Sequence, residues 1–196
     1  MIKLHATRKL FAKLPLNSDG QLPVTRQSEW LYEQPALDNN LLSDWHGKLV
    51  TLQHRNCMLL IHDATRFPLV FFALTKPDFA ELNGCFMKVF INTLIKCEAS
   101  EAQLEAAQRH LRPLTVDTEC NRSAQATLNR MKEELALLLE YDDLKVTDII
   151  DYNVSAWLAE TPRSIKGSPF LWPQREMLSL LDGLATTADT RPTNTE

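Results

Sequence analysis

The chain has 196 residues, which suits one domain or one domain with an appendage. It carries 21 Lys and Arg against 25 Asp and Glu, a net charge of −4, and its 44% hydrophobic content excludes a mainly disordered chain. This acidic balance argues against a protein that coats nucleic acid, and leaves room only for a local basic patch. No apolar run approaches the about 20 residues of a membrane span, and none near the N-terminus has the form of a signal peptide. We therefore expect a soluble cytoplasmic protein without a membrane partner.

Charge is distributed unevenly along the chain. Residues 1–76 carry nine Lys or Arg and six Asp or Glu, a balance of +3, so the remainder carries −7. Four of the five histidines also fall in the basic part: His5, His46, His54 and His62. This pattern predicts two surfaces of opposite potential, one of which could bind an anion.

The first half of the chain contains most of the predicted strands. Residues 1–7 predict a short strand and residues 8–14 a helical turn, followed by a loop over residues 17–35. Two apolar runs, 49–54 and 57–62, lie on either side of Arg55-Asn56 and predict a β-hairpin. Residues 69–73 predict a third strand.

Helices dominate the second half. Thr75 and Asp78 begin a helix well, and apolar residues follow at helical spacing to residue 97. Ser100 opens a second helix with a capping-box pattern, residues 114–118 predict an edge strand, and Ser123 is expected to cap a helix that runs to residue 141. Further helices are predicted over residues 147–159 and 173–184.

These elements predict an α+β fold. We expect a small, mainly antiparallel sheet from the N-terminal half, packed against several helices from the C-terminal half. The expected boundaries are a single domain over residues 1–184 and a disordered polar tail over residues 185–196.

The cysteines and glycines give no sign of a metal or cofactor. Four scattered cysteines lack the close pairing of a zinc site and are expected to be reduced thiols. Cys120 is the best candidate for a nucleophile among them, although we favour a structural role. Five glycines without pattern exclude a phosphate-binding loop and a dinucleotide fold in practice. We therefore expect no metal and no cofactor.

Polar residues at the strand ends are the candidates for catalysis. A metal-free ribonuclease needs an acid, a base and cationic groups for the phosphate. His46 and His62, both near the open end of the predicted hairpin, could supply the first two with Asp63 and Arg66. Alternatively, His62-Asp63 merely ends a strand and shapes the following turn.

Two other clusters have simpler explanations. Asp142, Asp143, Asp148 and Asp151 could converge on Mg²⁺, but a solvated junction between helices accounts for them better. Arg122 precedes a predicted helix N-terminus, where an anion is favoured. A surface that binds an anion or nucleic acid would comprise Lys9, His46, Arg55, Arg66, Lys76 and Arg122.

Several short motifs together resemble a known bacterial family. They are residues 4–10, Trp45-His46, residues 55–57, 63–67 and 74–79, Asn121-Arg122-Ser123 and Asn129. On these motifs the chain resembles the domain of unknown function 6933, from residue 1 to about residue 141. Many relatives look to have a glycine between residues 121 and 129, where this chain reads Ser-Ala-Gln-Ala over residues 123–126. The resemblance implies a bacterial protein, often associated with plasmids or mobile elements, and implies no particular activity.

Three functions stay open at this point. The favoured hypothesis is a non-enzymatic accessory protein of a mobile element, which binds nucleic acid or a protein partner. The second is a metal-independent nuclease or phosphotransferase-like toxin that uses the loop histidines. The third is an acidic mimic of nucleic acid, formed by residues 133–151, that inhibits a DNA-binding enzyme. The sequence leaves the oligomeric state open.

Overall fold

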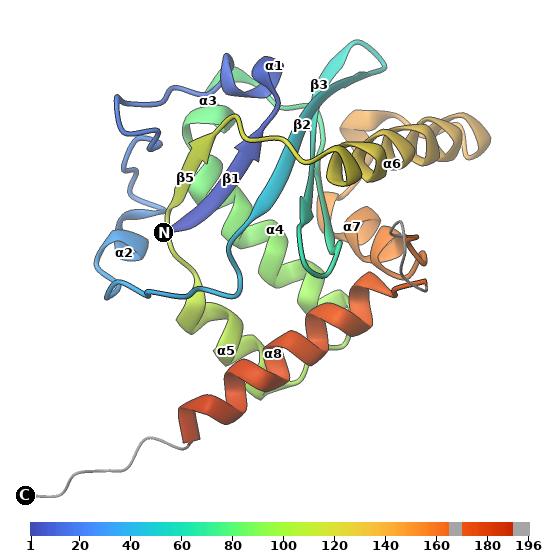
Figure 1. Cartoon of the computed structure of the whole chain (residues 1–196). Coiled ribbons are helices and arrows are strands. Elements are labelled where there is room, and N and C mark those ends of the chain that lie inside the picture. The colour runs from blue at the N-terminus through green and yellow to red at the C-terminus, as the bar shows by residue number, and fades with distance from the viewer. Residues whose placement is uncertain (165–169, 190–196) are drawn as a thin grey trace, which may run out of the picture.

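A five-stranded sheet forms the centre of the computed structural model, which describes residues 1–164 and 170–189. Its strands lie in the order β4-β3-β2-β1-β5 (Figure 1). Strand β1 is parallel to both of its neighbours, whereas the β2–β3 and β3–β4 pairs are antiparallel. The strands are β1 (Ile2–Ala6), β2 (Trp45–Leu52), β3 (Arg55–His62), β4 (Pro68–Phe71) and β5 (Leu114–Asp117).

The expected α+β class with a mainly antiparallel sheet is confirmed. The antiparallel pairs extend over the whole of β2 and β3, whereas the parallel pairs involve three or four residues each. Within the described residues, β5 is the one strand from the second half of the chain, and it lies at the predicted edge position. Its parallel pairing with β1 joins the two halves.

The turn of the hairpin differs from the prediction. It consists of Gln53 and His54, which have φ angles of 44° and 62°, rather than Arg55 and Asn56. Positive φ at both central residues is the geometry of the two-residue turn that matches the twist of paired strands. Strand β3 therefore begins at Arg55, which pairs with Leu52.

The predicted helices occur in the predicted order, but α2 (Glu29–Tyr32) lies within the segment predicted as a loop, and several boundaries differ. The helix predicted over residues 147–159 is the 3-10 turn η1 followed by α7, which begins at Asp151. The predicted helix after Thr75 is interrupted at Glu81, which separates α3 from α4. Asn121, rather than Ser123, caps α6, because its side-chain oxygen accepts hydrogen bonds from the backbone N–H groups of Ser123 and Ala124. The last helix continues to Asp189, into the segment expected to be a disordered tail, and residues 190–196 lie outside the described part of the chain. The helical segments are α1 (Arg8–Phe11), α2 (Glu29–Tyr32), α3 (Lys76–Ala80), α4 (Leu82–Lys96), α5 (Glu101–His110), α6 (Arg122–Tyr141), the 3-10 turn η1 (Val146–Asp148), α7 (Asp151–Ala159) and α8 (Pro173–Asp189).

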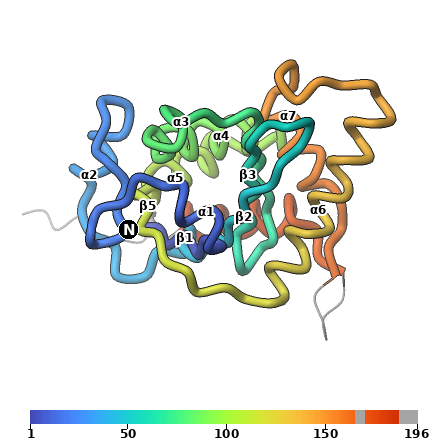
Figure 2. The backbone as a smooth tube through the Cα atoms, turned by 90° about the horizontal axis from the view of Figure 1, so that it is seen from above, coloured from blue at the N-terminus to red at the C-terminus, as the bar shows by residue number. Residues whose placement is uncertain are grey.

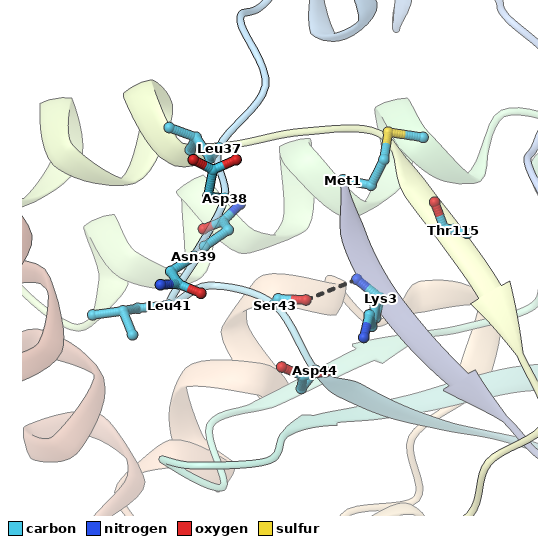
Figure 3. A pocket seen from close by; sticks show the side chains of 10 residues that line it. Met1, Lys3, Leu37, Asp38, Asn39, Leu41, Ser43, Asp44 and Thr115 are labelled. Carbon is cyan, nitrogen blue, oxygen red and sulfur yellow. Dashed lines mark hydrogen bonds between the residues drawn. The ribbon is translucent and has the colours of Figure 1, made fainter.

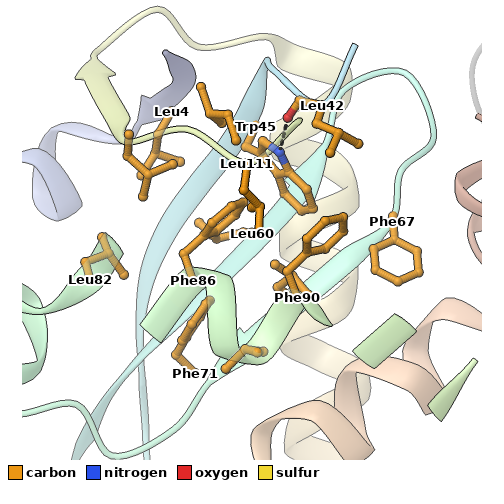
Figure 4. Packing of buried hydrophobic residues seen from close by; sticks show 14 of the residues in the cluster. Leu4, Leu42, Trp45, Leu60, Phe67, Phe71, Leu82, Phe86, Phe90 and Leu111 are labelled. Atoms are coloured by element: carbon orange, nitrogen blue, oxygen red, sulfur yellow. Dashed lines mark hydrogen bonds between the residues drawn. The ribbon is translucent and has the colours of Figure 1, made fainter. Parts of the chain in front are cut away.

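Helix α4 packs on one face of the sheet and forms the larger core. Trp45 of β2 is fully buried there and contacts Phe86 and Phe90 edge to face, with ring centroids 5.2 and 5.7 Å apart (Figure 4). Its indole N–H donates a 2.7 Å hydrogen bond to the carbonyl of Leu42, so the polar atom of this buried ring is satisfied. The chain before β2 is thereby fixed against the core.

Helix α6 packs on the opposite face, over β2 and β3, and forms a second core together with part of α7. Seen from above, α4 and the segment that leads from β5 to α6 lie on opposite sides of the sheet (Figure 2). To reach α6, this segment crosses β1 and β2 on the α6 face (Figure 1). No helix in the described part of the chain is long and apolar enough to cross a membrane.

Side chains of α7 satisfy the outer edge of strand β4. The hydroxyl of Ser155 accepts from the N–H of Val70 at 2.9 Å, and a carboxylate oxygen of Asp151 accepts from that of Phe72 at 3.0 Å. An edge strand whose N–H groups are occupied cannot pair with another chain there. Burial raises the pKa of Asp151 to about 6, against the opposing effect of this hydrogen bond.

We expect Asp151→Asn to stabilise the protein above pH 6. The folded pKa of about 6 lies above the ordinary value of 3.8, so the folded state prefers the protonated acid and loses stability as the pH rises from 3.8 to 6. Asparagine keeps the acceptor for Phe72 and carries no charge. At pH 8 the variant should gain about 1 to 2 kcal/mol in urea unfolding, and the gain should shrink towards pH 4. A less stable variant at pH 8 would show that the ionised carboxylate is favourable.

Candidate functional site

Three polar side chains form a row across the α6 face of the sheet. His5 on β1 pairs in register with His46 on β2 and, on its other side, with Asp117 on β5. Residues that are paired in register project from the same face of a sheet, and neighbouring strands are about 4.8 Å apart. The pairing of three strands therefore brings together residues up to 112 positions apart in the sequence.

His5 occupies the centre of this row, between two carboxylates. Its Nδ1 lies 2.7 Å from Oδ1 of Asp117, and its Nε2 lies 3.3 Å from Oδ1 of Asp44. Its ring packs against that of His46, with centroids 4.9 Å apart and planes tilted by 34°. Both ring nitrogens are thus held by neighbouring acids, which fixes the orientation of the imidazole.

A second carboxylate holds His46. Its Nε2 lies 3.1 Å from Oδ1 of Asp63, and the same oxygen accepts a 2.8 Å hydrogen bond from Arg66. Arg66 also reaches the hydroxyl of Ser123 in the first turn of α6, at 3.5 Å. His46 and Arg66 are 4% and 5% exposed, whereas the Asp63 side chain that joins them is 40% exposed and reaches solvent.

His46 has the properties of a general base. Burial is the largest effect on its pKa and lowers it below the usual value, against the opposing charge of Asp63. A neutral imidazole that donates from Nε2 to a carboxylate carries its lone pair on Nδ1. This Nδ1 atom is buried and has no hydrogen-bond partner within residues 1–164 and 170–189.

A cavity of about 370 Å³ opens over the two rings. Four carboxylates gather in or beside it, those of Asp44, Asp63, Asp117 and Glu119, and the first two and Glu119 line its wall. The crossing segment between β5 and α6 contributes one side, with Glu119, Cys120 and Asn121. The lining comprises His5, Asp44, His46, Asp63, Glu119, Cys120 and Asn121.

Two residues beside the histidines have left-handed backbone conformations. Asp44, directly before β2, has a φ of 65°, and Arg66, in the turn after β3, has a φ of 56°. Left-handed φ is uncommon for residues other than glycine and persists where the surroundings impose it. Both conformations aim a charged side chain at the histidine row, Asp44 towards His5 and Arg66 towards Asp63.

A larger cavity of about 640 Å³ lies next to this one and shares the wall residue Asp44. Figure 3 shows it between the loop of residues 37–44 and the start of β1, with Thr115 of β5 on the far side. Lys3 lines it from the same face of β1 as His5, two residues away. The two cavities thus lie in sequence along β1.

The other proposed catalytic histidine, His62, faces away from this row. It pairs with Trp45, on the α4 face, and its ring centroid lies 5.2 Å from that of the tryptophan. Its Nε2 donates to the carbonyl of Leu41 at 3.1 Å, and its Nδ1 contacts the hydroxyl of Thr65 at 2.9 Å. His46 and His62 share the open end of the hairpin, as expected, but lie on opposite faces.

The six proposed anion-binding residues do not form one surface. His46 and Arg66 are joined through Asp63, and Arg122 stands at the N-terminus of α6 beside the cavity residue Asn121. Arg55 begins β3 at the far end of the hairpin, about 20 Å along the strands from His46. The remaining two are exposed on other helices, Lys9 on α1 and Lys76 on α3.

The predicted carboxylate cluster does not contribute to the cavity, and Cys120 lies at the cavity without the properties of a nucleophile. Asp151 turns inward to the edge of β4, away from Asp142 and Asp143 at the end of α6. Cys120 does lie at the cavity, but burial and the charge of Asp117 raise the pKa of its thiol. A raised pKa disfavours the thiolate that a nucleophile requires.

Sequence reasoning missed the side of the site formed by His5, Asp117 and Glu119. Donor atoms of these three residues lie within 4.8 Å of one another, so they could hold a metal ion, contrary to the expectation of no metal. The sequence signal for His5 and Asp117 is that each lies near the end of its strand: His5 is one residue before the end of β1, and Asp117 is the last residue of β5. It becomes readable only once the parallel pairing of those strands is known.

We expect His62 to stabilise the fold without acting in the cavity. Burial lowers its pKa from 6.5 to about 4, so its contribution is complete above pH 6.5 and is lost as the pH falls towards 4. His62→Gln should cost about 1 to 3 kcal/mol at pH 7.5 in urea unfolding and should flatten the loss of stability between pH 6.5 and 4. Wild-type stability of this variant at both pH values would contradict the structural role.

Comparison with family models gives one match, which extends over residues 3–176 and is described as a domain of unknown function (DUF6933). Comparisons with curated proteins and with solved structures give no significant match. The match includes His5, His46 and Asp117 of this row. It also includes Asp44 and Asp63, the two other carboxylates that contact the histidines. With a family model matched over most of its length, the chain belongs to the DUF6933 family.

Proposed function

We propose that this protein is an enzyme of phosphoester hydrolysis or phosphoryl transfer, with the cavity over His5 and His46 as its active site. One observation carries the proposal. Two imidazoles from neighbouring strands contact each other in a shared cavity, and each is oriented by its own carboxylate. Converging titratable groups in a cavity are typical of catalytic sites.

In this proposal His46 is the general base. Asp63 accepts the Nε2 proton, and the Nδ1 lone pair, which is closed to solvent in the free protein, would remove a proton from water or from a substrate hydroxyl once substrate binding exposes it. Arg66 binds the same carboxylate oxygen and keeps Asp63 in place, which makes Arg66 a positioning residue.

The neighbourhood of α6 supports an anionic substrate. The N-terminus of this 20-residue helix meets the cavity at Asn121, and a helix N-terminus favours negative charge. Arg122 adds an exposed guanidinium in the same turn. The adjoining cavity of about 640 Å³ offers room for the remainder of a substrate, with Lys3 as a cationic contact.

The spread of the basic residues favours this enzyme over a non-enzymatic nucleic-acid-binding face. A binding face needs several cationic side chains on one surface, whereas Lys9, Arg55 and Lys76 lie apart from the cavity. The hypothesis of an acidic nucleic-acid mimic over residues 133–151 also loses support. Two of its acids do not present a free charge at the surface, because Glu134 pairs with Arg163 at 2.7 Å and Asp151 is turned inward. The proposal keeps the expectation of a bacterial cytoplasmic protein encoded on a mobile element, with RNA among its candidate substrates.

Replacement of the base should abolish turnover and leave the fold intact. We expect His46→Gln, which retains a donor towards Asp63, to lose about 100-fold or more of the rate, since general base catalysis contributes on that order. The assay would follow a phosphomonoester, a phosphodiester and single-stranded RNA, each with and without Mn²⁺.

His54→Gln is the matched control, because His54 lies in the hairpin turn at the other end of β2. It should retain full activity, and both variants should keep the wild-type melting temperature. Unchanged turnover in a folded His46→Gln would refute the assignment. Absence of hydrolysis of all three substrates by the wild type would refute the proposed chemistry.

A further inference from the structure

We infer that His5, Asp117 and Glu119 bind a divalent first-row transition-metal ion, such as Mn²⁺ or Zn²⁺. This inference deepens the proposed function and depends on it for any catalytic meaning, but the binding itself stands on the donor geometry. His5 and Asp117 are fixed by the pairing of β1 with β5, and Glu119 follows two residues after that strand. Their donor atoms lie within 4.8 Å of one another.

These separations fit a metal-ion ligand set. Bonds of about 2.0 to 2.2 Å from one ion to three ligands place the ligands about 3 to 4 Å apart. His5 Nδ1 and Asp117 Oδ1 already lie 2.7 Å apart, and Glu119 is exposed. A small rotation of Glu119 therefore completes a three-residue set.

The charge of the cavity favours a cation. Four carboxylates gather around it, and within the described chain the cationic side chain in contact with them is Arg66, which binds Asp63. An ion held by His5, Asp117 and Glu119 would reduce the repulsion among the acids and between them and an anionic substrate.

The surrounding contacts also suit a metal ligand. A metal-binding histidine usually donates its second ring N–H to a carboxylate, which fixes its tautomer. Asp44 occupies this position, with Oδ1 3.3 Å from Nε2 of His5, and leaves Nδ1 to face Asp117 and the proposed ion.

An independent observation on the same cavity is the state of His46. This side chain is buried, it lines the cavity, and its Nδ1 lacks a hydrogen-bond partner in the described part of the chain. A buried polar atom without a partner is costly unless a ligand completes its contacts. His46 therefore keeps an unused acceptor on the ring that packs against that of His5.

The donor set selects the type of ion. One imidazole and two carboxylates provide one nitrogen and several oxygens, a mixture that suits Mn²⁺, Fe²⁺ and Zn²⁺. Calcium and magnesium prefer ligand sets made of oxygen alone. We therefore expect Mn²⁺ and Zn²⁺ to bind more tightly than Mg²⁺.

Direct metal titration tests the site without reference to activity. The untagged, chelator-treated full chain should bind one Mn²⁺, followed by the loss of the free-ion signal in electron paramagnetic resonance, and Zn²⁺ should compete. Glu119→Gln and Asp117→Asn should each weaken Mn²⁺ binding at least 10-fold. Because Glu119 is exposed, its substitution leaves the fold intact even if Asp117→Asn does not fold.

The matched control is Asp38→Asn, which removes an acid from the neighbouring cavity and should bind Mn²⁺ as the wild type does. His46→Gln should also bind Mn²⁺ while lacking turnover. Absence of saturable binding below millimolar Mn²⁺, or wild-type affinity in Glu119→Gln, would overturn the inference. Phosphoester cleavage by a chain that shows no saturable Mn²⁺ binding would refute the metal site and spare the proposed function, whereas tight binding without phosphoester cleavage would do the reverse.

Discussion

The parallel pairing of β1 between β2 and β5 is the constraint on which the site depends. It aligns His5 with His46 on one side and with Asp117 on the other, on one face of the sheet. Because side chains alternate along a strand, a shift of any of these strands by one residue would turn its polar group towards the α4 core. The buried apolar residues of β1, Ile2 and Leu4, oppose that shift, so the packing of the core also maintains the site.

The two faces of the sheet serve different purposes. The α4 face is filled by aromatic and aliphatic side chains around Trp45, whereas α6 covers β2 and β3 on the other face. The segment from β5 to α6 crosses the part of this face that α6 leaves uncovered, and it brings Glu119 and Asn121 to the histidines. The polar cavity therefore lies where α6 no longer covers the sheet and the segment between β5 and α6 covers it instead.

Local sequence signals identified one half of the site, and long-range pairing supplied the other. His46, Asp63 and Arg66 were predictable because they flank a single hairpin. The exclusion of His62 was also within reach: a two-residue turn pairs even-numbered residues with odd-numbered ones, so His46 and His62 must face opposite sides. His5 and Asp117 gave no local signal, because parallel strands far apart in sequence carry no turn that fixes their register. Glu81, where α3 ends and α4 begins, accepts a hydrogen bond from Thr25, a contact that also carries no local sequence signal.

Nuclear magnetic resonance of the histidine rings would test most directly that the strand register creates this site. In the metal-free, isotope-labelled protein at pH 8, the account predicts nuclear Overhauser effects between the rings of His5 and His46, which lie 4.9 Å apart, and a proton on Nε2 of His46. It predicts no such effect between His46 and His62, which lie on opposite faces of the sheet. Contact between His46 and His62 without contact between His5 and His46 would contradict the account.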